Sequence, residues 1–253
     1  MIRYGDGRTN KYDVEAGNNT YDNAVIENSK ISEKNKIQNN QLMLDDIMNS
    51  TQYPKQLKDL ALKNEEALEF VYDYPAEHVK EHAIDLTEEA SMDSVPLFVQ
   101  WDKRWGYEKY SGNFFAASGC GPTTLSMVVV YLTHNREASP IAVAKYSKEA
   151  GYSVDGSGSS WTLISEGCMH YGVKAKAVAL DESRMKAELD EGHPIVVNVG
   201  PGDFTDTGHF MVITGYDDEG FSINDPNSIE KSGKRWLFKN ISSQIRAVWS
   251  MYV

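Results

Sequence analysis

The sequence is poor in cysteine and has no long apolar run. Only two cysteines, Cys120 and Cys168, occur among 253 residues, so a disulfide framework is excluded. No apolar stretch reaches the length of about 18 residues that a transmembrane helix needs. The opening residues MIRYGDGRTN also lack the pattern of a secretory signal peptide. We therefore expect neither a transmembrane segment nor a signal peptide in this chain.

Positive charge is scarce as well. The chain has 25 Lys and Arg against 37 Asp and Glu, which gives a net charge of −12. Residues 1–93 contribute −9 of this charge and residues 94–253 contribute −3. An acidic chain without a basic run has little attraction for a phosphate backbone, so we expect no nucleic-acid partner. We interpret the acidic excess of the first part as solvated surface first, and as a partner-binding site only second.

Metal-binding patterns are missing too. The cysteines and histidines lack the spacing of a zinc site. Asp203 and Asp206 stand near His209, but they lie in a Gly- and Thr-bearing run that we interpret as a mobile loop. We therefore expect no metal ion and no cofactor.

The composition that is present indicates a mostly globular chain. Apolar residues make up 41% and aromatic residues 11%, and 253 residues suffice for one domain with an extension. We divide the chain into a polar, acidic N-terminal arm at 1–93 and a domain at 94–253. In the arm we predict a tether or loosely ordered segment at 1–40, a short helix at 41–50, two short amphipathic helices within 53–72 separated near Asn64, and a linker at 73–93.

In the domain, helical periods come first and strand periods later. The elements predicted are an extended or strand segment at 96–101, an aromatic loop at 101–119, helices at 120–135, 138–152, 161–172 and 181–191, a flexible loop at 155–160, and strands at 194–200, 209–217, 221–225 and 246–253. This order predicts an α+β fold in which N-terminal helices pack on an antiparallel sheet, preceded by the helical extension.

Cys120 has the sequence context of a nucleophile. It lies at the start of the helix CGPTTLSMVVVYLT, where free backbone N–H groups and the helix dipole favour a thiolate. Gly119 and Gly121 allow a sharp turn and give a substrate close access to the thiol. The alternative is that Cys120 is a small buried hydrophobe, as a lone cysteine usually is. Cys168 stands in an apolar helical context, and we assign it to the core.

His209 and Asp225 are the candidate partners of this thiol. His209 opens a predicted strand, and Asp225 closes the next strand after the turn DDEG, so both lie near the same end of a hairpin. Simple register pairs Asp225 with about Val212. An imidazole can act as general base, and a carboxylate can hold its orientation. Taken singly, His209 could be an edge histidine and Asp225 a turn residue before Pro226. Their order after Cys120 is that of papain-like enzymes.

The segments VPLFVQWDKRWGY, SGCGPTTLSMV and EGHPIVVNVGPGDFTDTGHFMVITGYDDEGFSINDP carry a resemblance. They resemble the bacteriocin-processing (double-glycine leader) peptidases, family thirty-nine of the papain-like cysteine peptidases, in the free-standing branch without a transporter domain. The resemblance covers about residues 95–253. It implies a papain-like fold, a peptide or protein substrate, and Cys120, His209 and Asp225 as nucleophile, base and orienting acid. It also implies a bacterial protein that acts outside the cell or at its surface. We expect a monomer.

The resemblance also implies a glutamine that binds the oxyanion. Gln100 is the candidate, although it stands 20 residues before Cys120 and could equally be a polar residue of an exposed strand. For contact with the substrate we name Trp105 in the aromatic loop and Gly208 at the end of the run before His209, together with the two glycines beside the thiol. A packed aromatic loop is the alternative for Trp105.

Two further functions stay open at this point. The first is a peptide-binding module that keeps the fold without chemistry, which the acidic arm favours and the complete Cys, His and Asp set disfavours. The second is another thiol enzyme of related fold, a cell-wall amidase or a transpeptidase. The arm itself could be a surface tether or a cover over the cleft, and we expect a packed extension.

Overall fold

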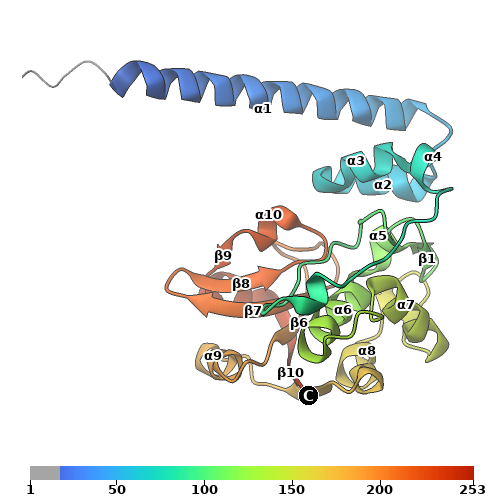
Figure 1. The fold of residues 1–253 in the computed structure, drawn as a ribbon, viewed down its shortest axis with the longest axis vertical. Coiled ribbons are helices and arrows are strands. Elements are labelled where there is room, and N and C mark those ends of the chain that lie inside the picture. Colours follow the sequence, from blue (N-terminus) through green and yellow to red (C-terminus); the bar gives the residue numbers. More distant parts are fainter. Residues whose placement is uncertain (1–17) are drawn as a thin grey trace, which may run out of the picture.

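Figure 1 shows a computed structural model of the chain, which describes residues 18–253 and the side chains from Glu33 onward. The predicted tether over 1–17 lies outside these residues. The loose segment expected over 18–40 is wrong, because α1 runs unbroken from Asn18 to Asn49 over 32 residues. Most of this helix is polar, so no apolar period predicted it. Among its described side chains, from Glu33 onward, those of the last turns around Ile47 pack against other helices.

The two short helices expected after α1 are confirmed. Helix α2 (Lys55–Lys63) ends at Asn64, whose side chain accepts a hydrogen bond from the backbone N–H of Glu66 at 3.0 Å. A 3-10 turn at Glu65–Ala67 leads into α3 (Leu68–Tyr72). Ile47 of α1, the apolar faces of α2 and α3, and Phe114 and Ala116 of the domain form one buried cluster. The end of the arm is therefore packed on the domain.

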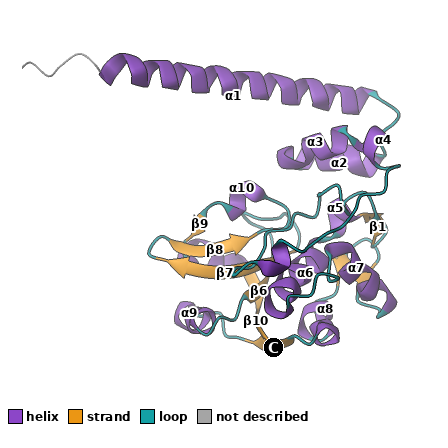
Figure 2. Ribbon diagram, viewed as in Figure 1, coloured by secondary structure: helices purple, strands orange, loops and turns teal. Residues whose placement is uncertain are grey.

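A six-stranded sheet forms the centre of the domain (Figure 2). Its strands are, in spatial order, β5 (Lys174–Ala177), β10 (Ile245–Tyr252), β6 (Ile195–Val199), β7 (His209–Asp217), β8 (Gly220–Asn224) and β9 (Arg235–Trp236), and every neighbouring pair is antiparallel. The four long strands match the predicted ones. Strands β5 and β9 are short, mostly exposed edge strands without an apolar run, and the sequence did not indicate them.

Helices cover both faces of this sheet. Phe210 and Val212 of β7 join the cluster under α6 (Cys120–Thr133) and α7 (Pro140–Glu149). Met211 and Ile213 of the same strand join a second cluster with Met185 of α9 (Glu182–Asp190). Successive strand side chains point to opposite faces, so β7 is buried on both sides at its start. The expected α+β architecture with helices packed on an antiparallel sheet is confirmed.

Smaller elements refine the other predictions. The segment 96–101 is extended but pairs with no strand. The predicted loops contain short hairpins, and the predicted helix over 161–172 is divided. These elements are α4 (Tyr74–Glu77), β1 (Lys109–Tyr110), β2 (Asn113–Phe114), α5 (Phe115–Ser118), β3 (Ser153–Val154), β4 (Gly158–Ser159), α8 (Thr162–Ser165) with a 3-10 turn at Gly167–Tyr171, α10 (Ile229–Ser232), and α11 (Phe238–Ile241) with a 3-10 turn at Ser242–Gln244.

Candidate active site

The thiol of Cys120 lies at the first residue of α6, with Gly119 as the N-cap. The thiol opens on a pocket of about 580 Å³ between the helical side of the domain and the strand ends of the sheet. Packing of α6 on β7 fixes this placement, because the hydroxyl of Thr124 donates a hydrogen bond to the Phe210 carbonyl at 3.1 Å. The backbone N–H groups in the first turn of a helix have no partner within the helix, so they are available to a side chain at the helix start such as that of Cys120. The half-buried Cys120 is therefore held beside the first residues of β7.

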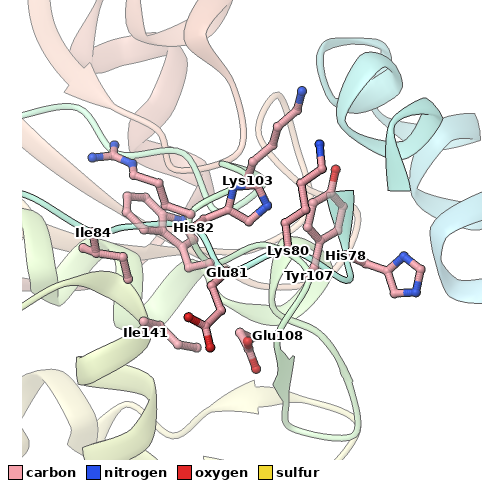
Figure 3. A pocket seen from close by; sticks show the side chains of 11 residues that line it. His78, Lys80, Glu81, His82, Ile84, Lys103, Tyr107, Glu108 and Ile141 are labelled. Carbon is pink, nitrogen blue, oxygen red and sulfur yellow. The ribbon is translucent and has the colours of Figure 1, made fainter. Parts of the chain in front are cut away.

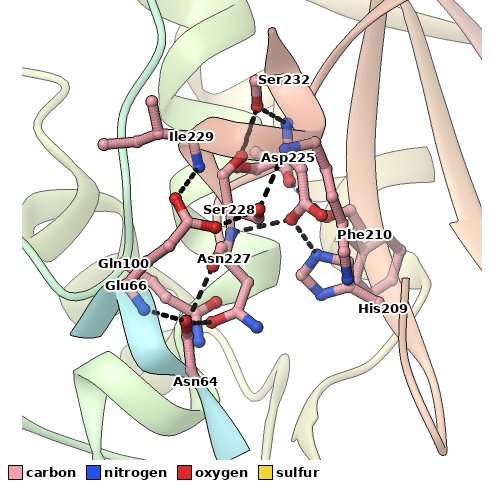
Figure 4. A network of polar contacts seen from close by, with 12 residues as sticks. Asn64, Glu66, Gln100, His209, Phe210, Asp225, Asn227, Ser228, Ile229 and Ser232 are labelled. Atoms are coloured by element: carbon pink, nitrogen blue, oxygen red, sulfur yellow. Dashed lines mark hydrogen bonds and ion pairs between the residues drawn. The ribbon is translucent and has the colours of Figure 1, made fainter. Parts of the chain in front are cut away.

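The side chains of His209 and Asp225 point toward one another (Figure 4). His209 is the first residue of β7, and Asp225 follows the last residue of β8. The strands pair Val212 with Asn224, one residue from the predicted register. The imidazole Nε2 lies 2.7 Å from Asp225 Oδ1, with the histidine 5% and the aspartate 0% exposed. The two residues form a buried, hydrogen-bonded pair, as the hairpin argument predicted.

The pKa values of the cysteine and the histidine move in opposite directions. Burial raises the pKa of the Cys120 thiol, but the hydrogen bond and charge of His209, helped by the backbone amides of Phe210 and Gly121, lower it below its usual value of 9.0. Burial lowers the pKa of His209, but Asp225 and then Cys120 outweigh this and raise it to about 10. Opposite shifts of this kind favour a thiolate beside an imidazolium.

Polar contacts hold the Asp225 carboxylate in place. Its Oδ1 also accepts a hydrogen bond from the backbone N–H of Asn227 at 2.8 Å, and its own backbone N–H donates to Ser232 Oγ at 2.9 Å. The backbone of His209 is held as well, since Asn198 Nδ2 of the neighbouring strand donates a hydrogen bond to the His209 carbonyl at 3.2 Å. The acid and the imidazole are thus positioned through their backbones as well as through each other.

Gln100 is buried next to the turn that follows Asp225. The residue is 4% exposed, and its Nε2 donates a hydrogen bond to the Ala116 carbonyl at 2.7 Å. Its backbone N–H donates to the Pro226 carbonyl at 2.7 Å, next to Asp225. An exposed strand position is therefore wrong for Gln100. An amide nitrogen carries a second hydrogen, so donation to an oxyanion stays a prediction.

The structure corrects three of the expected substrate contacts. Trp105 is 1% exposed, donates from Nε1 to the Val99 carbonyl at 2.9 Å, and does not line the pocket of Cys120. Its ring belongs to the core, because burying so large an apolar side chain is favourable. A Cβ at Gly119 would lie 2.6 Å from the Phe115 ring, and one at Gly121 would lie 2.6 Å from the Ser159 hydroxyl. Both glycines therefore serve close packing around α6. Gly208 does line the pocket.

Several residues of the pocket were missed. The largest are Trp161, Arg246, Phe210, Asn113 and Asn198, with Ser159 and Thr207 also in the lining. A polar residue within the apolar run PIVVNVG was a usable signal for Asn198. No sequence signal marked the others as lining, because a period predicts a helix or a strand and does not show which of its ends meets the pocket.

The second cysteine and the other hollow lack this chemistry. Cys168 is fully buried, and burial raises its pKa to about 11, which agrees with a core thiol. A hollow of about 340 Å³ between the arm and the domain is shown in Figure 3. The cations there have carboxylate partners, such as Lys103 with Asp73 at 2.6 Å and Arg104 with Glu89 at 3.0 Å. Its Lys and Arg side chains are therefore all paired, and its unpaired charges among the described residues are the carboxylates of Glu81 and Glu108.

The described residues hold neither a metal-site cluster nor a membrane-spanning helix. Among residues 33–253, no group of His, Cys, Asp and Glu side chains has the arrangement of a metal site. Within residues 18–253, no helix combines the length and apolar character needed to cross a membrane.

Comparison with known proteins gives the family. Residues 92–253 match the model of the Peptidase_C39 like family, so the chain belongs to that family. The peptidase domain of Streptococcus ComA, a bifunctional ABC transporter involved in quorum sensing, is 18% identical with a TM-score of 0.45, over 62% of this chain and 96% of that one. A C39-like peptidase of Bacillus anthracis is 18% identical with a TM-score of 0.39, over 63% and 95%. No curated protein matches the chain.

Proposed function

We propose that the protein is a thiol peptidase that hydrolyses peptide bonds through Cys120, His209 and Asp225. The observation that supports this most is the buried His209–Asp225 pair at 2.7 Å beside a pocket-facing cysteine at a helix start. Membership of a peptidase family agrees with it. A module without chemistry has no use for an imidazole held by a fully buried carboxylate.

Acylation is the first half of the proposed reaction. The Cys120 thiolate attacks the carbonyl carbon of the substrate, and a C–S bond forms while the carbonyl oxygen gains negative charge. Since Nε2 of His209 is held by Asp225, Nδ1 is the atom that donates the proton to the leaving amine nitrogen. The C–N bond then breaks, the amine product departs, and a thioester to Cys120 remains.

Deacylation completes the cycle. Neutral His209 removes a proton from a water molecule, and the resulting hydroxide attacks the thioester carbonyl. The C–S bond breaks, the acid product leaves, and the thiolate beside the imidazolium is restored. Asp225 stabilises the imidazolium throughout and keeps the ring oriented.

Digestion of a peptide library tests this function. Wild-type protein and Cys120→Ala are incubated in H₂¹⁸O with the library and separately with peptidoglycan fragments, and products are identified by mass spectrometry. We expect cleaved peptides with ¹⁸O at the new carboxyl group in the wild-type sample alone. Joined peptides would favour a transpeptidase, and release from peptidoglycan alone would favour an amidase. Cleavage by both proteins would contradict the role of Cys120. Action outside the cell remains a proposal that rests on the family resemblance.

A further inference from the structure

Arg246 brings the one formal positive charge to the described lining of the Cys120 pocket. Apart from the thiol itself, the other lining residues are small, polar or aromatic and neutral, and none of them is acidic. The chain as a whole carries −12. A lone arginine in the pocket lining of an acidic protein calls for a chemical explanation.

A β-bulge places this residue. In the pairing of β10 with β6, Ile245 faces Val199 and Ala247 faces Asn198, so Arg246 is the extra residue between them. A bulge changes the direction in which a strand side chain points, and bulges are common next to active sites. The exposed Arg246 therefore reaches the same pocket as Asn198.

The guanidinium has room and has no competing anion in the structure. A Cβ at Gly200 would lie 2.2 Å from Arg246 Nε, so only glycine lets the side chain lie against the backbone there. Across Glu33–Val253, no carboxylate forms an ion pair with Arg246. A planar guanidinium matches a carboxylate through two parallel hydrogen bonds.

We propose that Arg246 forms a subsite that binds a carboxylate of the substrate peptide next to the bond that Cys120 attacks. The carboxylate is either an acidic side chain or the terminal carboxyl group. This inference rests on the proposed peptidase function, because it assigns a specificity to the same pocket.

Peptide retention on the inactive protein tests the subsite without requiring cleavage. Immobilised Cys120→Ala and Cys120→Ala/Arg246→Gln are exposed to a library of matched pairs, Glu against Gln and Asp against Asn, each with a free or an amidated C-terminus. We expect Cys120→Ala to retain the carboxylate member of a pair about tenfold or more over the neutral member, and the double variant to lose this preference. Exposed Arg184 on α9 supplies the control, Cys120→Ala/Arg184→Gln, which keeps the preference.

Two outcomes overturn the subsite. In the first, Cys120→Ala recovers charged and neutral peptides equally, or recovers neither. In the second, the preference for the carboxylate peptide survives the change Arg246→Gln. Selective retention by the free C-terminus identifies an end-binding subsite, and retention of amidated acidic peptides identifies a side-chain subsite. If retention depends on Arg246 but wild-type protein cleaves nothing, the subsite stands and the proposed peptidase function fails.

A second, independent observation concerns Glu66 in the arm (Figure 4). Its Oε2 accepts hydrogen bonds from the backbone N–H groups of Ile229 at 2.7 Å and Glu230 at 3.1 Å. The Ser228 hydroxyl donates to its other carboxylate oxygen. Glu66 thus binds the free amides at the start of α10, four residues after Asp225. The arm therefore adds a carboxylate cap to a helix whose own N-cap residue is Ser228.

The same arm segment binds the turn that carries the acid. Asn64 Nδ2 donates to the Asn227 carbonyl at 2.9 Å, and the Asn227 N–H donates to Asp225 Oδ1 at 2.8 Å. A continuous line of hydrogen bonds therefore runs from the arm through the turn to Asp225 and on to His209. No residue of the described arm lines the Cys120 pocket. The described part of the arm thus contacts the turn next to the acid and not the pocket, which does not fit a cover over the cleft.

We propose that Glu66 is a positioning residue, which fixes Asp225 against His209 through the 227–230 turn. The test compares the pH dependence of Cys120 alkylation by iodoacetamide in wild type, Glu66→Ala and Glu65→Ala. Glu65 is the matched control, because it accepts a hydrogen bond from Asn40 of α1 and does not touch the turn. The titratable groups that face the thiol are His209, Tyr110 and, through the imidazole, Asp225.

We expect the alkylation midpoint to move upward in Glu66→Ala and to stay unchanged in Glu65→Ala, because a displaced Asp225 stabilises the imidazolium less. Glu66→Gln keeps a carbonyl acceptor and restores part of the shift. It also replaces Glu66→Ala if that variant does not fold. An unchanged midpoint in the folded Glu66 variant, or an equal shift in Glu65→Ala, overturns the proposal.

Discussion

The two cysteines should differ sharply in reactivity. The pKa of Cys120 lies below 9.0 and that of Cys168 is about 11, so the two differ by at least about two units. At any pH below both values, two units correspond to a hundredfold ratio of thiolate fractions. Because Cys168 is also fully buried and the thiolate is the nucleophile, we expect Cys120 to react at least about 100 times faster with iodoacetamide at pH 7.

The change His209→Ala probes the cause of this difference. It removes the hydrogen bond and the charge of His209 that lower the Cys120 pKa, and leaves the burial that raises it and the backbone hydrogen bonds of Phe210 and Gly121 that lower it. The pKa should then rise, and labelling at pH 7 should fall about tenfold or more. The assay is a time course of alkylation followed by peptide mass spectrometry of both cysteines. Equal labelling of the two cysteines, or labelling of Cys120 that is unaffected by His209→Ala, would refute the reasoning.

The remaining predictions concern pH, the orienting acid and the core. The rate of peptide cleavage should fall as the pH drops through the Cys120 pKa, because the thiolate is lost. It should fall again as the pH rises through about 10, where His209 loses its proton; a rate that keeps rising above pH 11 would contradict this. The stabilisation from the raised His209 pKa should be complete below 6.5 and lost toward 10, as denaturant titrations at several pH values can show. Asp225→Asn should lower kcat and also the melting temperature at neutral pH, because an amide lacks the charge that raises the His209 pKa and stabilises the imidazolium; an undiminished kcat would count against the role of the acid. Trp105→Ala should cost about 3–5 kcal/mol of unfolding free energy, since the ring is core; full stability combined with altered peptide selectivity would restore Trp105 to the cleft.

The strongly periodic elements were predictable, because burial of one face of a helix or strand makes apolar residues recur at a regular spacing in the sequence. Helix α6 and strands β6, β7, β8 and β10 lie in or against the two main clusters, and their apolar residues recur accordingly. His209 and Asp225 followed from that hairpin to within one residue of register. The site was thus predictable wherever it depends on strand ends and a helix start.

The rest depends on features without a sequence period. The bulge at Arg246 is a local irregularity of β10 and has no signal in a run such as RAVWSMYV. Helix α1 is polar on most of its length, so composition alone suggested a loose segment. Trp105 and the glycines beside Cys120 were assigned to the substrate because residue type does not reveal that the Trp105 ring is buried or that Phe115 and Ser159 occupy the space beside the glycines. The contact of Glu66 with α10 joins residues about 160 apart and needs the tertiary structure.

The most direct test of the central claim is detection of the acyl-enzyme. Wild-type protein is mixed with a peptide that it cleaves, quenched in acid within the first turnovers, and measured by intact-protein and peptide mass spectrometry beside Cys120→Ala and His209→Ala. The account predicts a mass increase equal to the N-terminal product minus one water, which is its acyl group, located on Cys120, that disappears with hydroxylamine and is absent from Cys120→Ala. Cleavage without any adduct on Cys120, or an adduct on another residue, would contradict it.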